Sequence, residues 1–196
     1  MSTLQLQLVS FEICAACRNV ATLSVRVENE METPRWLWAP PVRDEMLSLR
    51  AFGLTWRVEG KHLEGTAWQD SLQSLVICLD EPIAGVVWPS SLKQLVFSGG
   101  FNQPIAGVGW PSSLKQLTFW YCFNQPIAGV VWPSSLEQLT FGYMFNQPIT
   151  GVVWPPSLEQ LTFGVSFNQP IAGVVWPSSL EQLTFGYMFN QPITGV

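Results

Sequence analysis

The feature that most constrains this chain is a short sequence repeat. The segment Phe-Asn-Gln-Pro-Ile begins at Phe101, Phe123, Phe145, Phe167 and Phe189, with the same spacing each time. A fixed period of about 20 to 50 residues, here about 22 residues, is the sequence signature of repeat proteins, in which each unit buries its apolar face against its neighbours. A catalytic motif is normally needed once, so the repetition indicates architecture before it indicates chemistry.

Each unit has a leucine-rich half and a proline-rich half. The first half reads Leu-x-x-Leu-x-Phe, and its last three positions alternate between apolar and polar residues, which predicts a half-buried β-strand. The leucine pairs are Leu92/Leu95, Leu114/Leu117, Leu136/Leu139, Leu158/Leu161 and Leu180/Leu183. The second half carries two prolines per unit and no helical periodicity, which predicts turns and extended chain.

The same spacing continues toward the N-terminus in altered form. Similar apolar patterns begin at Val20, Met46 and Leu72, and they predict strands that end near Val25, Ala51 and Ile77. Stacked units would pair each strand with its copy in the next unit. The predicted fold is therefore mainly β: a leucine-rich-repeat-like solenoid with one parallel sheet, about eight coils of about 22 residues and little helix.

The pattern divides the chain into three parts. Residues 1–45 are expected to form an N-terminal cap and degenerate first repeats, with a short helix over residues 10–18. Residues 46–91 are expected to form degenerate repeats, and residues 92–196 form near-perfect ones. The chain stops before the next Trp-Pro, so a C-terminal cap is expected to be missing, and end-to-end self-association through this uncapped end is a further expectation.

Residues that recur in register predict columns of like side chains. The Leu, Phe, Ile and Trp of each unit are expected to fill the interior. Asparagine suits a turn because its side-chain amide forms hydrogen bonds with neighbouring backbone groups. The sequence predicts a structural turn ladder made of Asn102, Asn124, Asn146, Asn168 and Asn190.

The outward positions of the strands form the candidate partner-binding face. Its residues are Lys93, Gln94, Lys115, Gln116, Thr118, Glu137, Gln138, Thr140, Glu159, Gln160, Thr162, Glu181, Gln182 and Thr184. The glutamines and threonines would make a flat polar surface, bordered by a charged column that changes from lysine to glutamate between Lys115 and Glu137. Repeat proteins usually bind through such an extended surface. We therefore expect an unknown protein partner to contact this face, above all at the change from lysine to glutamate.

Composition and charge argue against several other functions. The chain has 9 Lys and Arg against 14 Asp and Glu, and only 12% of its residues are charged. Nucleic-acid binding needs a basic stripe, so it is not expected. Membrane association is not expected either, because no run approaches the roughly 18 apolar residues of a membrane span. The N-terminus lacks the features of a signal peptide, and a cytoplasmic location is expected.

Residues that could support catalysis or bind metal are few. His62 is the only histidine, it has no triad partners at recognisable spacing, and no glycine-rich phosphate loop occurs. Cys14 and Cys17 have the CxxC spacing of zinc and redox sites, but no second pair follows, so reduced structural thiols are expected. The glutamates of the regular repeats would stack like with like, which favours solvent exposure over an acid–base pair. We expect no catalytic residue, no cofactor and no metal.

These residues give the unit a family resemblance. It resembles the FNIP repeat, a leucine-rich-repeat-like module named for Phe-Asn-Ile-Pro. Here the motif has Gln in place of Ile, and the following Pro-x-Ser-Leu-x-x-Leu-x-Phe-Gly portion matches well over about residues 65–196. BspA-like repeats are a second resemblance, although they carry Met and Phe where this chain has Leu-x-x-Leu-x-Phe. Both resemblances imply a solenoid used for interaction and neither implies an enzyme.

A regular surface such as ice or a polysaccharide is the alternative ligand. Threonines repeated at about 4.8 Å along the sheet would form an ordered array of the kind that such a ligand contacts. The array contains a single threonine column, flanked by glutamine, so interaction with a protein remains the first hypothesis.

Overall fold

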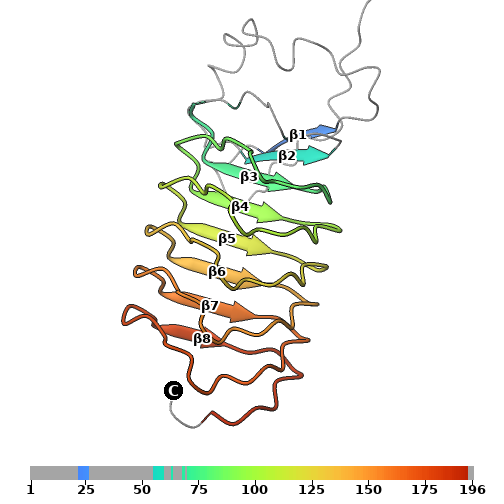
Figure 1. The fold of residues 1–196 in the computed structure, drawn as a ribbon. Helices are drawn as coiled ribbons and strands as arrows, with labels where there is room; N and C mark the ends of the chain where they lie inside the picture. The colour runs from blue at the N-terminus through green and yellow to red at the C-terminus, as the bar shows by residue number, and fades with distance from the viewer. Residues whose placement is uncertain (1–21, 27–54, 60–62, 64–67, 69, 194–196) are drawn as a thin grey trace, which may run out of the picture.

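The structure is a computed structural model that describes residues 22–26, 55–59, 63, 68 and 70–193. These residues form one sheet of eight parallel strands, stacked in chain order as Figure 1 shows. The strands are β1 (Thr22–Arg26), β2 (Thr55–Glu59), β3 (Ser74–Ile77), β4 (Gln94–Phe97), β5 (Gln116–Phe119), β6 (Gln138–Phe141), β7 (Gln160–Phe163) and β8 (Gln182–Thr184). No helix occurs in the part of the chain that the structure describes.

The coils are regular from β4 to β8. Each of these strands pairs with the strand one repeat later, so that Gln94 aligns with Gln116 and Gln116 aligns with Gln138. The offset from β3 to β4 is slightly shorter, because Ser74 aligns with Gln94. The predicted fold class, a mainly β solenoid with one parallel sheet, is confirmed. The predicted total of eight coils rests in part on residues outside the described ones.

The predicted position of the second strand is wrong. The leucine spacing places this strand within residues 46–51, whereas the strand between β1 and β3 is β2, Thr55–Glu59. In β2, Trp56 aligns with Leu75 and Val58 aligns with Ile77. Register in a sheet follows the alternation of apolar and polar residues. The segment Thr-Trp-Arg-Val-Glu alternates over its whole length, whereas two apolar residues three positions apart, as at Met46 and Leu49, do not specify an alternating strand.

The division of the chain into three parts stays a prediction. Apart from β1, the proposed cap over residues 1–45 and its helix over residues 10–18 lie outside the described residues. At the other end, Phe185 and Phe189 are half-buried, whereas the equivalent Phe163 and Phe167 are buried. No described coil covers β8, and the expected end-to-end association also stays a prediction.

Each strand from β3 to β7 buries one face. In β6, Leu139 and Phe141 are buried, while Gln138 and Thr140 are half-buried on the other side. Leu136, which precedes the strand, is also fully buried. Three apolar residues from the sheet side of each of these coils therefore enter the core. No polar or charged residue among those described is buried.

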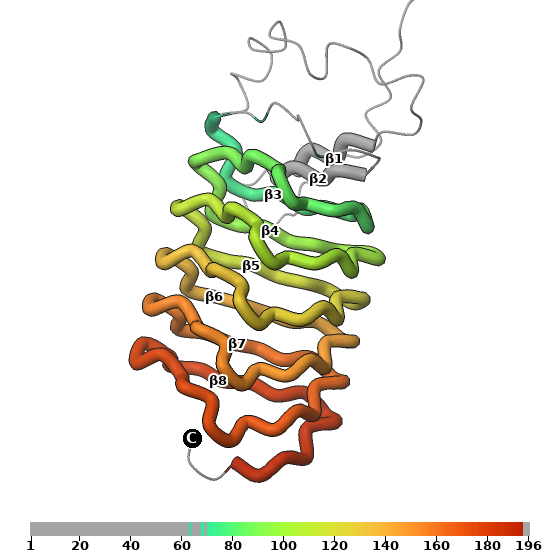
Figure 2. Tube along the Cα trace, in the orientation of Figure 1, coloured from blue at the N-terminus to red at the C-terminus, as the bar shows by residue number. Residues whose placement is uncertain are grey.

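The proline-rich half of each coil forms the opposite wall. The tube in Figure 2 shows each coil as a flattened loop, with the strand on one side and this back wall on the other. After β6, the N–H of Val152 donates to the carbonyl of Ile149 at 3.2 Å, and Gly151 between them has a φ of 79°. A positive φ at the third position of such a turn favours glycine. This requirement explains the glycine of Ile-x-Gly-Val in every regular coil.

Phenylalanines stack along the axis between the two walls. Phe141 lies with its ring centroid 5.8 Å from that of Phe119 and 5.6 Å from that of Phe163. Within its own coil it also stacks on Phe145 at 4.2 Å. Each aromatic side chain of this kind buries a large apolar area and gains about 0.5–1.5 kcal/mol from each ring pair. A single coil offers only the pair within itself, so neighbouring coils supply the rest of the core.

Tryptophans of the Trp-Pro pairs form a second stack. The ring of Trp110 lies 6.3 Å from that of Trp88 and 6.4 Å from that of Trp132, in near-parallel planes. Trp88 also meets Phe97 edge to face. The indole N–H groups of Trp68, Trp88, Trp110, Trp132 and Trp154 are buried without a hydrogen-bond partner among the described residues. A buried unpaired donor costs about 1–3 kcal/mol. The indole N–H therefore does not explain why tryptophan occupies this position, and the buried ring area and the stacking do.

Asparagine side chains connect successive coils. The backbone N–H of Asn146 donates to Oδ1 of Asn124 at 2.9 Å, and the N–H of Asn168 donates to Oδ1 of Asn146 at 2.9 Å. Nε2 of Gln169 donates to the same oxygen of Asn146 at 3.1 Å. The same backbone contact joins Asn102 to Asn124 and Asn168 to Asn190. Each of these oxygens accepts two hydrogen bonds from the next coil, which gives the Phe-Asn-Gln-Pro segment a structural role.

The asparagine ladder begins at an aspartate. Oδ1 of Asp80 accepts a hydrogen bond from the N–H of Asn102 at 2.8 Å and one from Nε2 of Gln103 at 2.9 Å. The repeat spacing did not assign Asp80, although its Asp-Glu-Pro-Ile segment aligns with Asn-Gln-Pro-Ile. Asparagine and aspartate provide the same acceptor oxygen, so the ladder extends one coil further toward the N-terminus than the predicted set.

Close contact between coils also requires glycine after three of the strands. A Cβ at Gly142 would overlap the carbonyl oxygen of Trp120, and a Cβ at Gly164 would overlap that of Gly142. Gly186 meets the backbone of Gly164 in the same way. The backbone turns that follow β6, β7 and β8 therefore pack directly on the preceding coil.

Replacement of Asn146 tests the ladder. Asn146→Ala removes the acceptor of two hydrogen bonds, so the free energy of unfolding should fall by about 1–3 kcal/mol. Asn146→Asp keeps the acceptor, as Asp80 does in its own coil, and should lose less than half as much. Urea denaturation followed by circular dichroism measures both values. Equal losses in the two variants would contradict a hydrogen-bonding role for the side chain.

Candidate functional site

The predicted face residues lie in three parallel columns on the outward side of the sheet. The glutamine and threonine columns run in direct register, with Gln138 aligned with Gln160 and Thr140 aligned with Thr162. The charged residues form the third column, and each immediately precedes a strand. The structure thus brings together the residues of the candidate partner-binding face.

The face between β5 and β8 is polar. Gln160 and Gln182 are exposed, and the threonines, two residues further along each strand, are half-buried. Farther toward the N-terminus, Nε2 of Gln94 donates to Oε1 of Gln116 in the next coil. In the β8 coil, Nε2 of Gln182 donates to Oγ1 of Thr184 at 3.4 Å. These glutamines therefore satisfy part of their hydrogen-bonding capacity within the chain.

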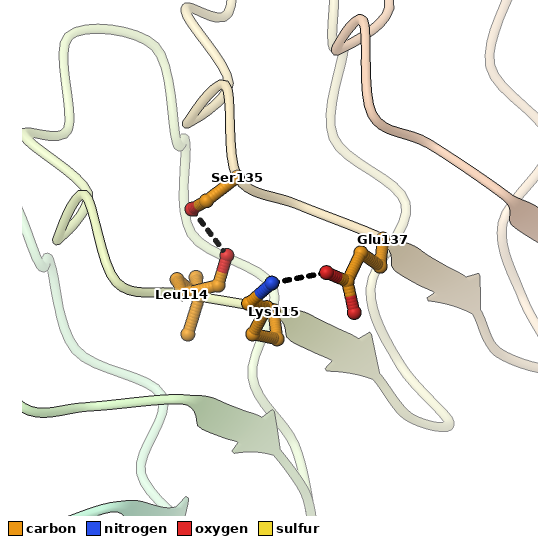
Figure 3. A network of polar contacts seen from close by, with 4 residues as sticks. All are labelled: Leu114, Lys115, Ser135 and Glu137. Carbon is orange, nitrogen blue, oxygen red and sulfur yellow. Dashed lines mark hydrogen bonds and ion pairs between the residues drawn. The ribbon is translucent and has the colours of Figure 1, made fainter. Parts of the chain in front are cut away.

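Where the charged column changes from lysine to glutamate, the two residues at the change form an ion pair with each other. Nζ of Lys115 contacts Oε1 of Glu137 across the two coils (Figure 3). Close by, the hydroxyl of Ser135 donates to the carbonyl of Leu114 at 2.8 Å. The side chains of Lys115 and Glu137 stay 46% and 34% exposed. A ligand that bound here would have to compete with this pair, which weakens the case for these two residues as the centre of recognition.

An exposed aromatic cluster was missed by the sequence patterns. We call it the edge strip, and its residues are Trp120, Tyr121, Tyr143, Met144, Tyr187 and Met188, with exposed fractions of 60%, 51%, 41%, 43%, 92% and 51%. They lie in the turns that follow the strands, at the carboxyl end of the sheet. The rings of Tyr121 and Tyr143 stack with centroids 4.9 Å apart.

Backbone contacts between coils fix the spacing of the edge strip. The N–H of Met144 donates to the carbonyl of Tyr121 at 3.0 Å, and the N–H of Met188 donates to that of Val165 at 3.0 Å. The strip has a sequence signal, because the three residues between the two phenylalanines of each unit vary more than their surroundings. They read Ser-Gly-Gly, Trp-Tyr-Cys, Gly-Tyr-Met, Gly-Val-Ser and Gly-Tyr-Met.

The back wall exposes a column of valines. Val87, Val131, Val153 and Val175 are each 80% or 81% exposed. Gly109 takes the same position between the first two, and a shallow depression of about 460 Å³ opens there between Trp88 and Trp110. No charged side chain in the described part of the chain lines this depression.

The described residues contain no group of side chains with the spacing of a metal site. No three His, Cys, Asp or Glu side chains among them lie close enough to share a metal ion. Cys78 and Cys122 are free, and Sγ of Cys78 lies 2.8 Å from Oγ of Ser98. Cys14, Cys17 and His62 lie outside the described residues. None of the described chain forms a helix long and apolar enough to span a membrane.

Comparison with known proteins agrees with this architecture. The family model of the FNIP repeat matches residues 80–122, 123–166 and 167–196. Among solved structures, the crystal structure of CroV588, described as a novel circular LRR protein, is 41% identical in sequence with a TM-score of 0.64. The match covers 72% of this chain and 21% of that one, so it spans only a small part of the CroV588 structure. A search of curated proteins finds no match.

The ion pair is expected to contribute little to stability. Glu137→Gln should lower the free energy of unfolding by no more than about 1 kcal/mol, because both side chains are partly exposed and salt screens them. Glu159→Gln is the matched control, since it removes a like charge from beside Glu137 and should be neutral or slightly stabilising. Urea unfolding at low and high salt measures both. A loss above about 2 kcal/mol for Glu137→Gln would exceed what an exposed ion pair contributes and would show that the pair is a structural requirement.

Proposed function

Because the chain belongs to the FNIP repeat family, we propose that it is a non-catalytic scaffold for protein–protein interaction through its outward strand face. Solenoids of this kind are typically non-catalytic. The observation that best supports the proposal is the continuous polar face from β5 to β8, where glutamine and threonine columns repeat in register. A repeated surface offers a partner the same groups at a fixed spacing over many coils.

The chemistry of this face suits a protein better than a polyanion. Its charged border contains more glutamates than lysines, and Lys115 is already paired with Glu137. Without a basic stripe, electrostatic attraction to nucleic acid is absent from the face. A cytoplasmic location accompanies the proposal, because the free thiols of Cys78 and Cys122 would stay reduced there.

A charge-introducing variant tests the strand face. The triple variant Gln138→Lys, Thr140→Lys and Gln160→Lys places three like charges on neighbouring coils without touching the buried side. We expect the immobilised variant to retain at least tenfold less of the proteins that the unaltered chain captures from lysate, with an unchanged circular dichroism spectrum. A partner fitted to a neutral surface would have to bury the introduced charges unpaired, and its polar groups would lose their hydrogen-bond partners.

The matched control adds the same charge to the other wall. Val131→Lys, Val153→Lys and Val175→Lys alter side chains that are each 80% or 81% exposed on the back wall, and capture should be unaffected. The proposal is wrong if the strand-face variant captures the same proteins as strongly as the unaltered chain.

A regular surface such as ice or a polysaccharide is the second candidate ligand. The observation in its favour is the register of Thr118, Thr140 and Thr162, which lie one coil apart on a flat face. Thermal hysteresis or polysaccharide binding that disappears in the strand-face variant would support this candidate. If the unaltered chain shows neither activity, the candidate is excluded.

A further inference from the structure

The edge strip is not explained by packing within the fold. Its side chains are 41–92% exposed, whereas the phenylalanines of the interior coils are buried. The coil of β7 has Val165 and Ser166 at the equivalent positions and keeps the same backbone contact, since the N–H of Ser166 donates to the carbonyl of Tyr143 at 2.9 Å. The coil therefore forms without an aromatic residue there, and Tyr143 and Tyr187 need another explanation.

The composition of the strip is that of a binding surface. Trp, Tyr and Met are enriched at the centres of protein interfaces, and Trp and Tyr are enriched among the residues that contribute most to binding. Contiguous exposed apolar surface is uncommon on soluble proteins and marks interaction sites. Trp120, Tyr121, Tyr143 and Met144 come from two consecutive coils, so they are neighbours on this edge.

The strip is uncharged, and its surroundings are uncharged as well. The segments from the strand end through Phe-Asn-Gln-Pro-Ile contain no Asp, Glu, Lys or Arg in any regular coil. The charged column precedes the strands and lies at the opposite end of the sheet. A ligand complementary to the strip is therefore also uncharged where it makes contact, since burial of an unpaired charge is costly.

The spacing of the strip matches an extended proline-rich segment. Tyr143 and Met144 lie two coils before the identical pair Tyr187 and Met188. At about 4.8 Å per coil, two coils rise about 9.6 Å, and a polyproline II helix repeats every three residues, or about 9.3 Å. Prolines three residues apart would thus meet equivalent side chains.

We propose that the edge strip binds an uncharged, proline-rich segment of a protein partner in the polyproline II conformation. Such segments have backbone carbonyls that are free to accept hydrogen bonds, which tyrosine hydroxyls donate, and aromatic side chains recognise their proline rings. The rings of Tyr121 and Tyr143 stack with planes 16° apart, so each keeps one face and its hydroxyl for a ligand.

This inference goes beyond the proposed function, because it concerns a different surface and specifies the chemistry of the ligand. The probe is a fluorophore-labelled peptide of twelve prolines with blocked ends, and the comparison peptide is an uncharged Gly-Ser peptide of the same length. Fluorescence anisotropy should show saturable binding of the proline peptide, at least tenfold tighter than binding of the Gly-Ser peptide. Tyr143→Ser with Tyr187→Ser should weaken it at least tenfold.

Two further variants separate recognition from folding. Tyr143→Phe with Tyr187→Phe keeps the rings and should bind within about threefold to fivefold of the unaltered chain, because only the hydroxyl bonds are lost. Tyr187→Ser alone alters a side chain that is 92% exposed, so it should weaken binding without changing the urea midpoint. The Lys substitutions at Gln138, Thr140 and Gln160 should leave peptide binding unchanged, which separates this inference from the proposed function.

The inference is overturned by any of three results. These are no saturable binding of the proline peptide, equal binding of the Gly-Ser peptide, or unchanged binding by the Tyr→Ser variants. Displacement of the labelled peptide by an uncharged oligosaccharide such as cellohexaose, with loss of oligosaccharide binding in the same Tyr→Ser variants, would also overturn it and assign the strip to a polysaccharide.

Discussion

The hydrogen bond from each asparagine N–H to the asparagine oxygen of the preceding coil is the contact on which this fold depends. A turn in the back wall has no strand partner for its backbone, and an N–H group left unpaired between two coils would cost about 1–3 kcal/mol. Oδ1 of Asn146 supplies an acceptor to Asn168, and the same contact recurs from Asp80 to Asn190. The ladder fixes the distance between coils on this wall as the parallel sheet does on the other.

The apolar core follows from that fixed spacing. Once coils lie one strand spacing apart, equivalent side chains of neighbouring coils contact each other. The phenylalanine and tryptophan stacks therefore run along the axis. Contacts of Gly142 and Gly164 with the preceding backbone show how closely the coils approach. Most of each repeat is therefore committed to contacts between coils, and sequence that differs between units concentrates where the coil faces solvent.

The regular part of the fold could be predicted from sequence because its signals are periodic. Leu139 and Phe141 alternate with polar residues, and the same alternation recurs in every regular unit. This alternation was enough to predict the sheet, its register and the side of it that faces outward. The position of β2 could not be predicted in this way, because the leucine spacing favoured residues 46–51 while a different alternating segment takes the register. Periodicity locates a coil only where the unit is repeated faithfully.

The functional surfaces were harder to predict for a physical reason. Whether Lys115 is available to a partner depends on the reach of its side chain toward Glu137, which spacing alone does not specify. The exposure of Tyr187 depends on the path of the turn after β8. The sequence alone does not say whether an aromatic side chain in such a turn is buried or faces solvent. The residues that repeat in every unit are the ones that form the core and the ladder. The three variable residues between the two phenylalanines of each unit are not needed for these contacts.

Native-state hydrogen exchange of the asparagine backbone amides tests the central claim most directly. If the asparagine oxygens accept these N–H groups, the amides of Asn124, Asn146 and Asn168 should exchange as slowly as those of the neighbouring strands, within about tenfold. Exchange of these amides at the rate of an unstructured peptide, while the strands remain protected, would contradict the account. The coils would then be joined by the sheet and core alone.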